Sequence, residues 1–274
     1  MRALEFINRV GPGCRVLSIV GGGGKTSLLF ALASDAGSAG LSALLTTTTR
    51  IYDPRDEHRA FDTLLLNEAW VVAGSSLPAA HDVRGDSPAG GFIAVLGSGV
   101  VAGKMVAIHP DLIDTCPGDW DMVLVEADGA RHRPIKAPAD HEPVIPHGSD
   151  MVCAVVGLDC LGAPLDDDHA FRPELLERVT GLKQGQRIEA GTIAALCAAP
   201  RGCFKGTPAG ARRVLILNKA DMVSIDSARI VAGAVISTGG VDAVAIATLG
   251  EYQSDSRIRD FYVADARDDG ALLV

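Results

Sequence analysis

Short runs of apolar residues recur along the chain and alternate with segments that carry apolar residues at helical spacing. The runs predicted to be strands are 15–20, 41–45, 92–96, 121–125, 151–156, 213–217 and 241–247. The segments predicted to be helices are 3–10, 26–36, 171–181, 189–198 and 224–236. Unbroken apolar runs are typical of strands buried on both faces, and helices that alternate with strands connect parallel neighbours. The pattern therefore predicts an α/β fold with a mostly parallel sheet flanked by helices.

The remaining segments are less regular. Residues 51–69 read as a loop with a weak helix, 70–73 and 100–108 as short strands, and 111–115 as a helical turn. The proline-rich stretch 134–146 is interpreted as an ordered functional loop, with an interdomain hinge as the alternative. No repeat or clear linker divides the chain. We expect one domain over residues 1–274, with insertions at about 51–110 and 130–210.

The composition argues against two classes of protein, general nucleic-acid-binding proteins and membrane-spanning proteins. Hydrophobic residues make up 47% of the chain, which allows a sizeable core, and the net charge of −9 argues against general nucleic-acid binding. No run approaches the ~18 apolar residues of a membrane span, and residues 1–10 carry no apolar signal core. The six cysteines form no C-x-x-C pair and are expected to be reduced, buried, small apolar residues. These features predict a cytoplasmic protein.

Four glycines, a lysine and a threonine join the first predicted strand to the first predicted helix. Glycines let backbone N–H groups approach a phosphate, and the following helix N-terminus favours negative charge. Lys25 is expected to contact the β- and γ-phosphates, and the Thr26 hydroxyl to bind Mg²⁺. The spacing departs from G-x-x-x-x-G-K-T because Ile19 stands at the first glycine position, and the loop resembles a shorter form in one P-loop subclass. The predicted phosphate-binding residues are Gly21, Gly22, Gly23, Gly24, Lys25, Thr26 and Ser27.

The segment Asn218-Lys219-Ala220-Asp221 follows the strand predicted at 213–217 and matches the N-K-x-D pattern of GTPases. A carboxylate at this position accepts hydrogen bonds from guanine N1–H and the 2-amine, whereas adenine would leave it unpaired. The stem of Lys219 is expected to cover the base face. We predict guanine binding by Asn218, Lys219 and Asp221, with a polar helix cap at Asp221 as the alternative.

Two carboxylates, Glu126 and Asp128, follow the strand predicted at 121–125, and Gly129 comes next. Ligands of open α/β sheets bind at the carboxyl ends of the strands. One carboxylate is expected to hold Mg²⁺ or to orient the attacking water, and the Gly129 N–H to contact the γ-phosphate. The sequence does not say which carboxylate touches the metal. The segment 126–129 resembles the E-x-x-G switch motif of GTPases that insert nickel into urease and hydrogenase.

Further polar residues lie near these motifs. Arg131, Arg133 and Lys136 either stabilise phosphate charge, with Arg131 our candidate, or bind an anionic second substrate, or form a solvated loop. Residues 46–50 are four threonines and an arginine, which either complete the second strand or assist the metal and phosphate. The histidines of the middle region lack metal-ligand spacing and are interpreted as loop or surface residues; they are His132, His141, His147 and His169.

Together these pieces resemble the YqeC family. The resemblance runs almost end to end and is carried by residues 20–26, 46–51, 125–131, 134–138, 141–146, 156–159, 169–174 and 217–221. It implies a cytoplasmic accessory protein of selenium-dependent molybdenum hydroxylases. A molybdopterin-type cofactor, the hydroxylase itself and cofactor-assembly proteins are the implied ligands and partners.

We therefore expect a P-loop NTPase fold that binds Mg²⁺ and GTP, with ATP as the other candidate nucleotide. The expected catalytic residues are Lys25, Glu126, Asp128 and Arg131, and the expected metal ligands are Thr26, Glu126 and Asp128. Three functions stay open: a maturation GTPase, a small-molecule kinase or nucleotidyltransferase, and a nucleotide-gated binding module without hydrolysis. Val20, where the subclass often has a second lysine, keeps the last function open. A homodimer is a further expectation from the frequency of two-fold symmetry.

Overall fold

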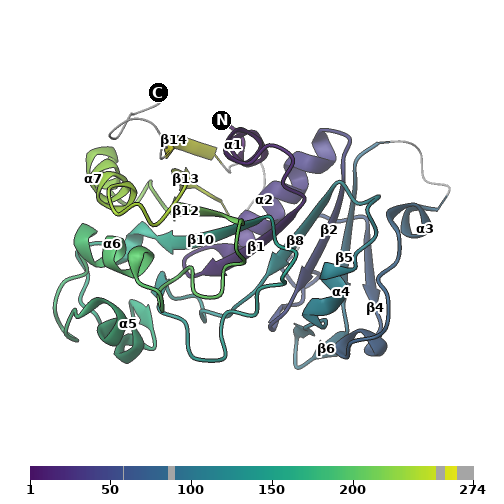
Figure 1. The fold of residues 1–274 in the computed structure, drawn as a ribbon, viewed down its shortest axis with the longest axis horizontal. Coiled ribbons are helices and arrows are strands. Elements are labelled where there is room, and N and C mark those ends of the chain that lie inside the picture. The colour runs from purple at the N-terminus through teal and green to yellow at the C-terminus, as the bar shows by residue number, and fades with distance from the viewer. Residues whose placement is uncertain (58, 86–89, 251–256, 264–274) are drawn as a thin grey trace.

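The computed structural model describes residues 1–57, 59–85, 90–250 and 257–263. Nine strands form its main sheet (Figure 1): β1 Val16–Gly21, β2 Ser42–Thr47, β4 Thr63–Leu66, β5 Phe92–Gly97, β8 Met122–Glu126, β10 Met151–Gly157, β12 Arg212–Asn218, β13 Ala243–Thr248 and β14 Arg257–Val263. Their order is β14-β13-β12-β10-β1-β8-β2-β5-β4. All neighbours are parallel except β13 and β14, which are antiparallel. The prediction of a mostly parallel sheet is confirmed.

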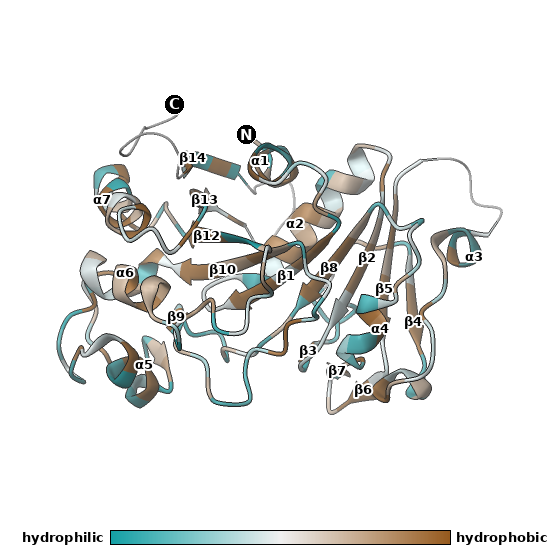
Figure 2. Ribbon diagram, viewed as in Figure 1, coloured by the Kyte–Doolittle hydropathy of each residue, from teal (hydrophilic) through white to brown (hydrophobic). Residues whose placement is uncertain are grey.

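Helices cover both faces of the sheet (Figure 1). Helices α1 (Ala3–Val10) and α2 (Lys25–Ser38) pack on one face. On the opposite face, α6 (Ala190–Ala198) and α7 (Ile225–Ile236) cover β10, β12 and β13, while α4 (Pro110–Asp114) covers β2, β5 and β8. Figure 2 shows the hydrophobic strands enclosed between these layers, with hydrophilic residues gathered on the outer helices and loops. Two further helices, α3 (Ala80–Arg84) and α5 (Pro173–Thr180), lie towards the two ends of the sheet.

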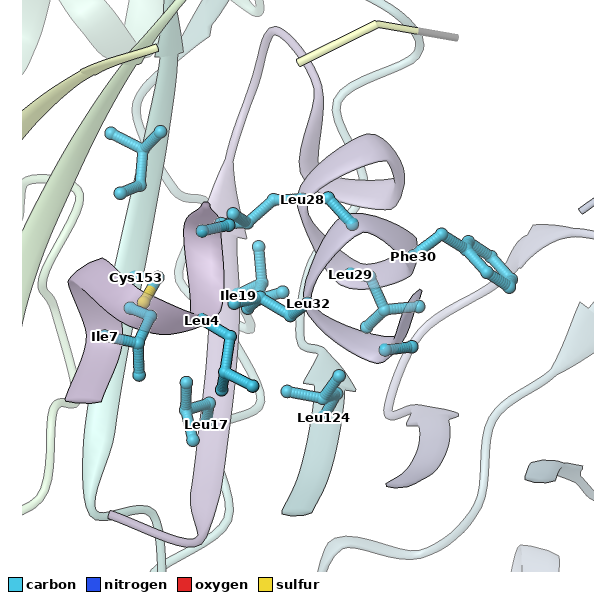
Figure 3. Close-up of a cluster of buried hydrophobic side chains, with 14 of the residues drawn as sticks. Leu4, Ile7, Leu17, Ile19, Leu28, Leu29, Phe30, Leu32, Leu124 and Cys153 are labelled. Carbon is cyan, nitrogen blue, oxygen red and sulfur yellow. The ribbon is translucent and has the colours of Figure 1, made fainter. Parts of the chain in front are cut away.

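The packing of β1 explains why its sequence is an unbroken apolar run. Side chains alternate across a strand, so Leu17 and Ile19 point at α1 and α2, while Val16 and Val20 point at the opposite face. Figure 3 shows Ile19 beside Leu32 of α2 and Leu17 beside Leu4 of α1, within one buried cluster. Each fully buried leucine contributes about 2–3 kcal/mol of hydrophobic stabilisation. This packing holds the β1–α2 turn in place.

The irregular region after β2 differs from its prediction. Residues 51–69 contain two strands, β3 (Ile51–Tyr52) and β4, rather than a loop with a weak helix. Residues 70–73 are not a strand, because Glu68–Val71 forms the short 3-10 helix η1. The Asn67 side chain caps this helix by accepting from the Ala69 N–H, and the buried Trp70 ring donates to the Ser76 carbonyl. These local capping and side-chain contacts outweigh the strand preference of the apolar run.

Two other strand predictions differ from the structure in detail, the first because of a backbone turn. Residues 100–108 form a hairpin, β6 (Gly99–Val101) and β7 (Lys104–Val106), because Ala102 and Gly103 both have positive φ, 53° and 70°. Strand β7 also pairs with β3. The strand predicted at 241–247 is β13, and a further strand that was not predicted from the sequence, β14, follows it.

Smaller elements lie over the carboxyl ends of the central strands. The proline-rich stretch contains β9 (Ile135–Lys136), which pairs in parallel with β11 (Ala170–Phe171), and η2 (Leu158–Cys160) follows β10. Five of the six cysteines are buried as predicted, and Cys14 is partly exposed. None of the helices in the described part of the chain has the length and apolarity needed to cross a bilayer. The assignment of one domain with two insertions stays a prediction.

Candidate functional site

The glycine-rich turn and the two predicted carboxylates meet at one edge of the sheet. Strand β1 pairs with β8 so that Ile19 lies opposite Glu126. Because parallel neighbours end at the same edge, the turn after β1 and the segment after β8 lie side by side. Lys25 begins α2 directly above them. The structure therefore brings together Gly21–Thr26, Glu126 and Asp128, as the sequence predicted.

Lys25 is held between two carboxylates. Its Nζ lies 3.6 Å from Glu126 Oε1 and 3.5 Å from Asp128 Oδ1, and it donates to the Gly21 carbonyl over 2.9 Å. The three side chains are 5%, 7% and 2% exposed. Burying an ionised group is costly unless opposite charges and hydrogen bonds surround it. This cluster meets that condition with side chains from two separate elements.

The hydroxyl of Thr26 completes the cluster. It donates to Glu126 Oε2 over 2.8 Å. Burial raises the pKa of the Glu126 carboxyl, and the Lys25 cation and the Thr26 hydrogen bond oppose that rise. Asp128 accepts from the Gly21 N–H over 3.0 Å. Hydroxyl and carboxylate oxygens are the donors that Mg²⁺ prefers, so Thr26, Glu126 and Asp128 fit the predicted metal chemistry.

The glycine turn is tightly enclosed by other backbone segments. The Gly22 N–H donates to the Val155 carbonyl and the Gly23 N–H to the Arg133 carbonyl, each over 2.9 Å. A Cβ at Gly22 would meet the Arg133 carbonyl, and one at Gly23 would meet Gly157. Glycine is therefore required for packing here. Of the predicted phosphate donors, Gly21, Gly22 and Gly23 point at protein acceptors in this structure, and the first turn of α2, which includes Ser27, offers N–H groups that a helix cannot satisfy internally.

The threonines at the end of β2 are mainly structural. Thr47 donates its hydroxyl to the Glu126 carbonyl over 2.8 Å, and Thr46 donates to the Leu96 carbonyl over the same distance. Thr48 donates to the Val144 carbonyl over 2.6 Å. Thr49 is the exception, since its hydroxyl faces the position that a Cβ on Gly129 would take. Three of the four hydroxyls thus hold β2 to its neighbours.

The N-K-x-D segment divides into a buried and an exposed part. The Asn218 amide donates to the Gly23 carbonyl and its oxygen accepts from the Leu249 N–H, each over 2.8 Å. Asn218 is buried and ties the glycine turn to the segment after β13. Lys219 has a left-handed φ of 59° and pairs with Asp159 at 2.5 Å. Asp221 is exposed at the same edge.

The predicted basic cluster separates in the structure. Lys136 is buried, with its Nζ 3.0 Å from Asp128 Oδ2 and 2.8 Å from Glu142 Oε2, and it donates to the Gly129 carbonyl. Arg131 is exposed and, with Arg133, lines a cavity of about 440 Å³ beside the glycine turn. Lys136 therefore neutralises carboxylates and does not face this cavity.

Sequence reasoning missed two members of the charged network, Glu142 and Arg172. Arg172 donates to Glu142 Oε2 over 2.9 Å and also lines the cavity. Both residues lie in segments that carry the family resemblance, 141–146 and 169–174. That resemblance is the sequence feature that could have identified them. The four histidines lie in turns, as predicted; His132, His141 and His147 are exposed and His169 is partly exposed.

Comparison with known proteins identifies the family. Residues 17–174, more than half of the chain, match the family described as YqeC protein. A relative from Escherichia coli (strain K12), named "Uncharacterized protein YqeC", is 34% identical over 209 residues, which is 74% of this chain and 75% of the relative. No solved structure matches. The family match includes Lys25, Glu126 and Arg172 but ends before Asn218. On these two similarities the chain belongs to the YqeC family.

Proposed function

We propose that this protein binds and hydrolyses a Mg²⁺–nucleoside triphosphate at the Lys25 cluster, with GTP preferred. One observation carries the proposal: a buried lysine at a helix N-terminus lies between two strand-end carboxylates, and a threonine hydroxyl bonds to one of them. Phosphates offer negative charge to Lys25 and to the helix N-terminus. A bound Mg²⁺ would neutralise phosphate charge, and Thr26 with Glu126 would hold it.

The other residues have distinct proposed roles. Asp128 is fixed by the Gly21 N–H and by Lys136, so its carboxylate is positioned to orient a water molecule. Arg131 is exposed beside the turn and is our candidate for stabilising charge on the transferred phosphate. Asn218 holds the base-side segment against the glycine turn, and Asp221 is the proposed reader of guanine. As the biological role we propose the cytoplasmic maturation of a selenium- and molybdenum-containing hydroxylase, a proposal that rests on the resemblance that the sequence motifs carry.

Titration calorimetry with GTP, ATP and CTP, each with Mg²⁺, tests this proposal. GTP should bind at least about tenfold more tightly than ATP, a difference of about 1.4 kcal/mol. Asp221→Asn should remove that preference, because an amide cannot accept both guanine hydrogen bonds. Asp226→Asn, an exposed carboxylate in the first turn of α7, is the matched control and should keep the preference. Tighter binding of ATP or CTP, or an unchanged preference in Asp221→Asn, would contradict guanine recognition.

A second function, a small-molecule kinase or nucleotidyltransferase, is favoured by the cavity that Arg131 and Arg133 line. This cavity adjoins the glycine turn, because the Arg133 carbonyl accepts from the Gly23 N–H. An acceptor molecule in the cavity would lie next to the phosphates. A transferase would consume nucleotide in the presence of that small molecule alone, whereas a maturation GTPase would need a partner protein.

A further inference from the structure

A cavity of about 440 Å³ opens between the segment after β8 and the β11–α5 connection. It is lined by Arg131, Arg133, Asp167, Ala170, Phe171, Arg172 and Glu174. Its volume lies within the range of small-molecule sites, and Phe171 gives it an apolar wall. Arg131 and Arg172 both lie against that ring, with the guanidinium carbons 5.5 Å and 4.5 Å from its centroid.

The lining of this cavity is rich in arginine, although the protein as a whole is acidic. The chain has a net charge of −9, but three guanidinium groups converge on the cavity against two lining carboxylates, Asp167 and Glu174. A third carboxylate, Asp168, lies 3.6 Å from Arg133. Guanidinium groups bind phosphate and carboxylate through paired, planar hydrogen bonds. The lining is therefore suited to an anion.

The backbone around the cavity is held in costly conformations. Five non-glycine residues in the described ranges have positive φ, and three of them flank this cavity: Arg131 at 46°, His132 at 62° and Arg172 at 59°. Left-handed backbone is strained in a residue other than glycine, because Cβ approaches the following carbonyl oxygen. Such conformations concentrate at functional sites, where they aim side chains that an ordinary loop would direct elsewhere. Here two of the three residues are the cavity's arginines.

A chain of partly buried and buried charges connects the cavity to the glycine turn. Arg172 bonds to Glu142, Glu142 to Lys136, Lys136 to Asp128, and Asp128 faces Lys25, with successive distances of 2.9, 2.8, 3.0 and 3.5 Å. Burial raises the pKa of Glu142, but Lys136 and Arg172 outweigh burial and hold it below its ordinary value. An anion that takes Arg172 away from Glu142 would alter the charge balance of every later member.

We propose that this cavity binds a small organic anion, a phosphate ester or a carboxylate, and that its occupancy is coupled to the nucleotide site through Glu142, Lys136 and Asp128. Arg131, Arg133 and Arg172 are the anion ligands. The coupling rests on the proposed nucleotide function, whereas the anion site does not.

Titration of the nucleotide-free protein with ribose 5-phosphate and with citrate tests the anion site, and neutral ribose is the reference ligand. At least one anion should bind, and the better one identifies the phosphate or carboxylate class. Arg131→Gln and Arg172→Gln should each weaken binding about tenfold, because each removes a charge-assisted hydrogen bond. Arg131 is exposed, so its variant should fold even if Arg172→Gln does not. Arg178→Gln, an exposed arginine on α5 outside the cavity, is the matched control and should bind as wild type.

Repeating the GTP titration with the bound anion tests the coupling. The affinity for GTP should change by about threefold or more in wild type and stay constant in Arg172→Gln. Failure of both anions to bind, or unchanged anion affinity in both arginine variants, would overturn the site. A constant GTP affinity in wild type would overturn the coupling. If the protein binds no nucleotide but needs Arg131 and Arg172 to bind an anion, the proposed function fails and the anion site stands.

Discussion

The Lys25 cluster and the N-K-x-D segment were both predicted to contact one nucleotide, yet their side chains differ in burial and in pairing. In the cluster, Lys25, Glu126 and Asp128 are all buried and paired with one another. In the N-K-x-D segment, Asn218 is buried and bonded on both sides, whereas Asp221 is exposed. In the Lys25 cluster the charged side chains are already held in place by one another. In the N-K-x-D segment the structural residue Asn218 is followed, three positions later, by the exposed carboxylate of Asp221.

The two regions differ in whether a substitution can change ligand binding without also changing the stability of the fold. A buried charge cluster is stable only while every member has its partner, so a change there disturbs stability and binding together. An exposed carboxylate is already solvated, so its replacement changes recognition alone. We expect the two regions to give different mutational signatures, and the predictions below test that contrast.

Lys25→Met should have the largest effect. Removing the cation leaves Glu126 and Asp128 facing each other without it, which should lower the free energy of unfolding by about 3 kcal/mol. Urea unfolding monitored by circular dichroism measures the change. Lys183→Met is the matched control, because Lys183 is 71% exposed and, among the residues that the structure describes, its ion pair is with Glu177 at the surface. A loss below about 1 kcal/mol in Lys25→Met would show that the cluster is not a stabilising unit.

Asn218→Ala should have the next effect. It removes hydrogen bonds to the Gly23 carbonyl and the Leu249 N–H, both buried, and should cost about 2 kcal/mol. Asp221→Asn, three residues away, should stay within about 0.5 kcal/mol of wild type in the same unfolding experiment. Equal losses of unfolding free energy in the two variants would contradict the proposal that Asn218 is structural and Asp221 serves recognition.

Glu142→Gln should have the smallest effect of the three destabilising variants and a defined pH dependence. The pKa of Glu142 lies below its ordinary value of 4.5 in the folded protein, so the ionised carboxylate stabilises the fold above pH 4.5. That contribution is lost as the pH falls through the lowered pKa. The variant should therefore be less stable than wild type by about 1 kcal/mol at pH 7, and the difference should shrink below pH 4.5. A difference that is constant from pH 7 to pH 3 would contradict the ion-pair explanation.

Much of the site could be predicted because its signals are local. Lys25, Thr26, Glu126 and Asp128 stand at or within a few residues of the ends of buried apolar strands, and parallel strands bring such positions to one edge of a sheet. The family resemblance was likewise predicted from these segments and is confirmed. Arg172 and Glu142 carry no local signal of this kind. They meet because β9 pairs with β11, which no pattern of neighbouring residues indicates.

Local patterns in the sequence are sufficient to predict the alternation of strands and helices and the glycine-lysine turn, since apolar periodicity and glycine act over a few neighbouring residues. They also predict the acidic end of β8. Three features follow instead from tertiary packing: β4 and β14 join the sheet, the Arg133 carbonyl accepts from the Gly23 N–H, and Lys136 is buried against Asp128. These outcomes depend on which distant segments pair, and that choice is made by the packing of the whole sheet rather than by any local pattern.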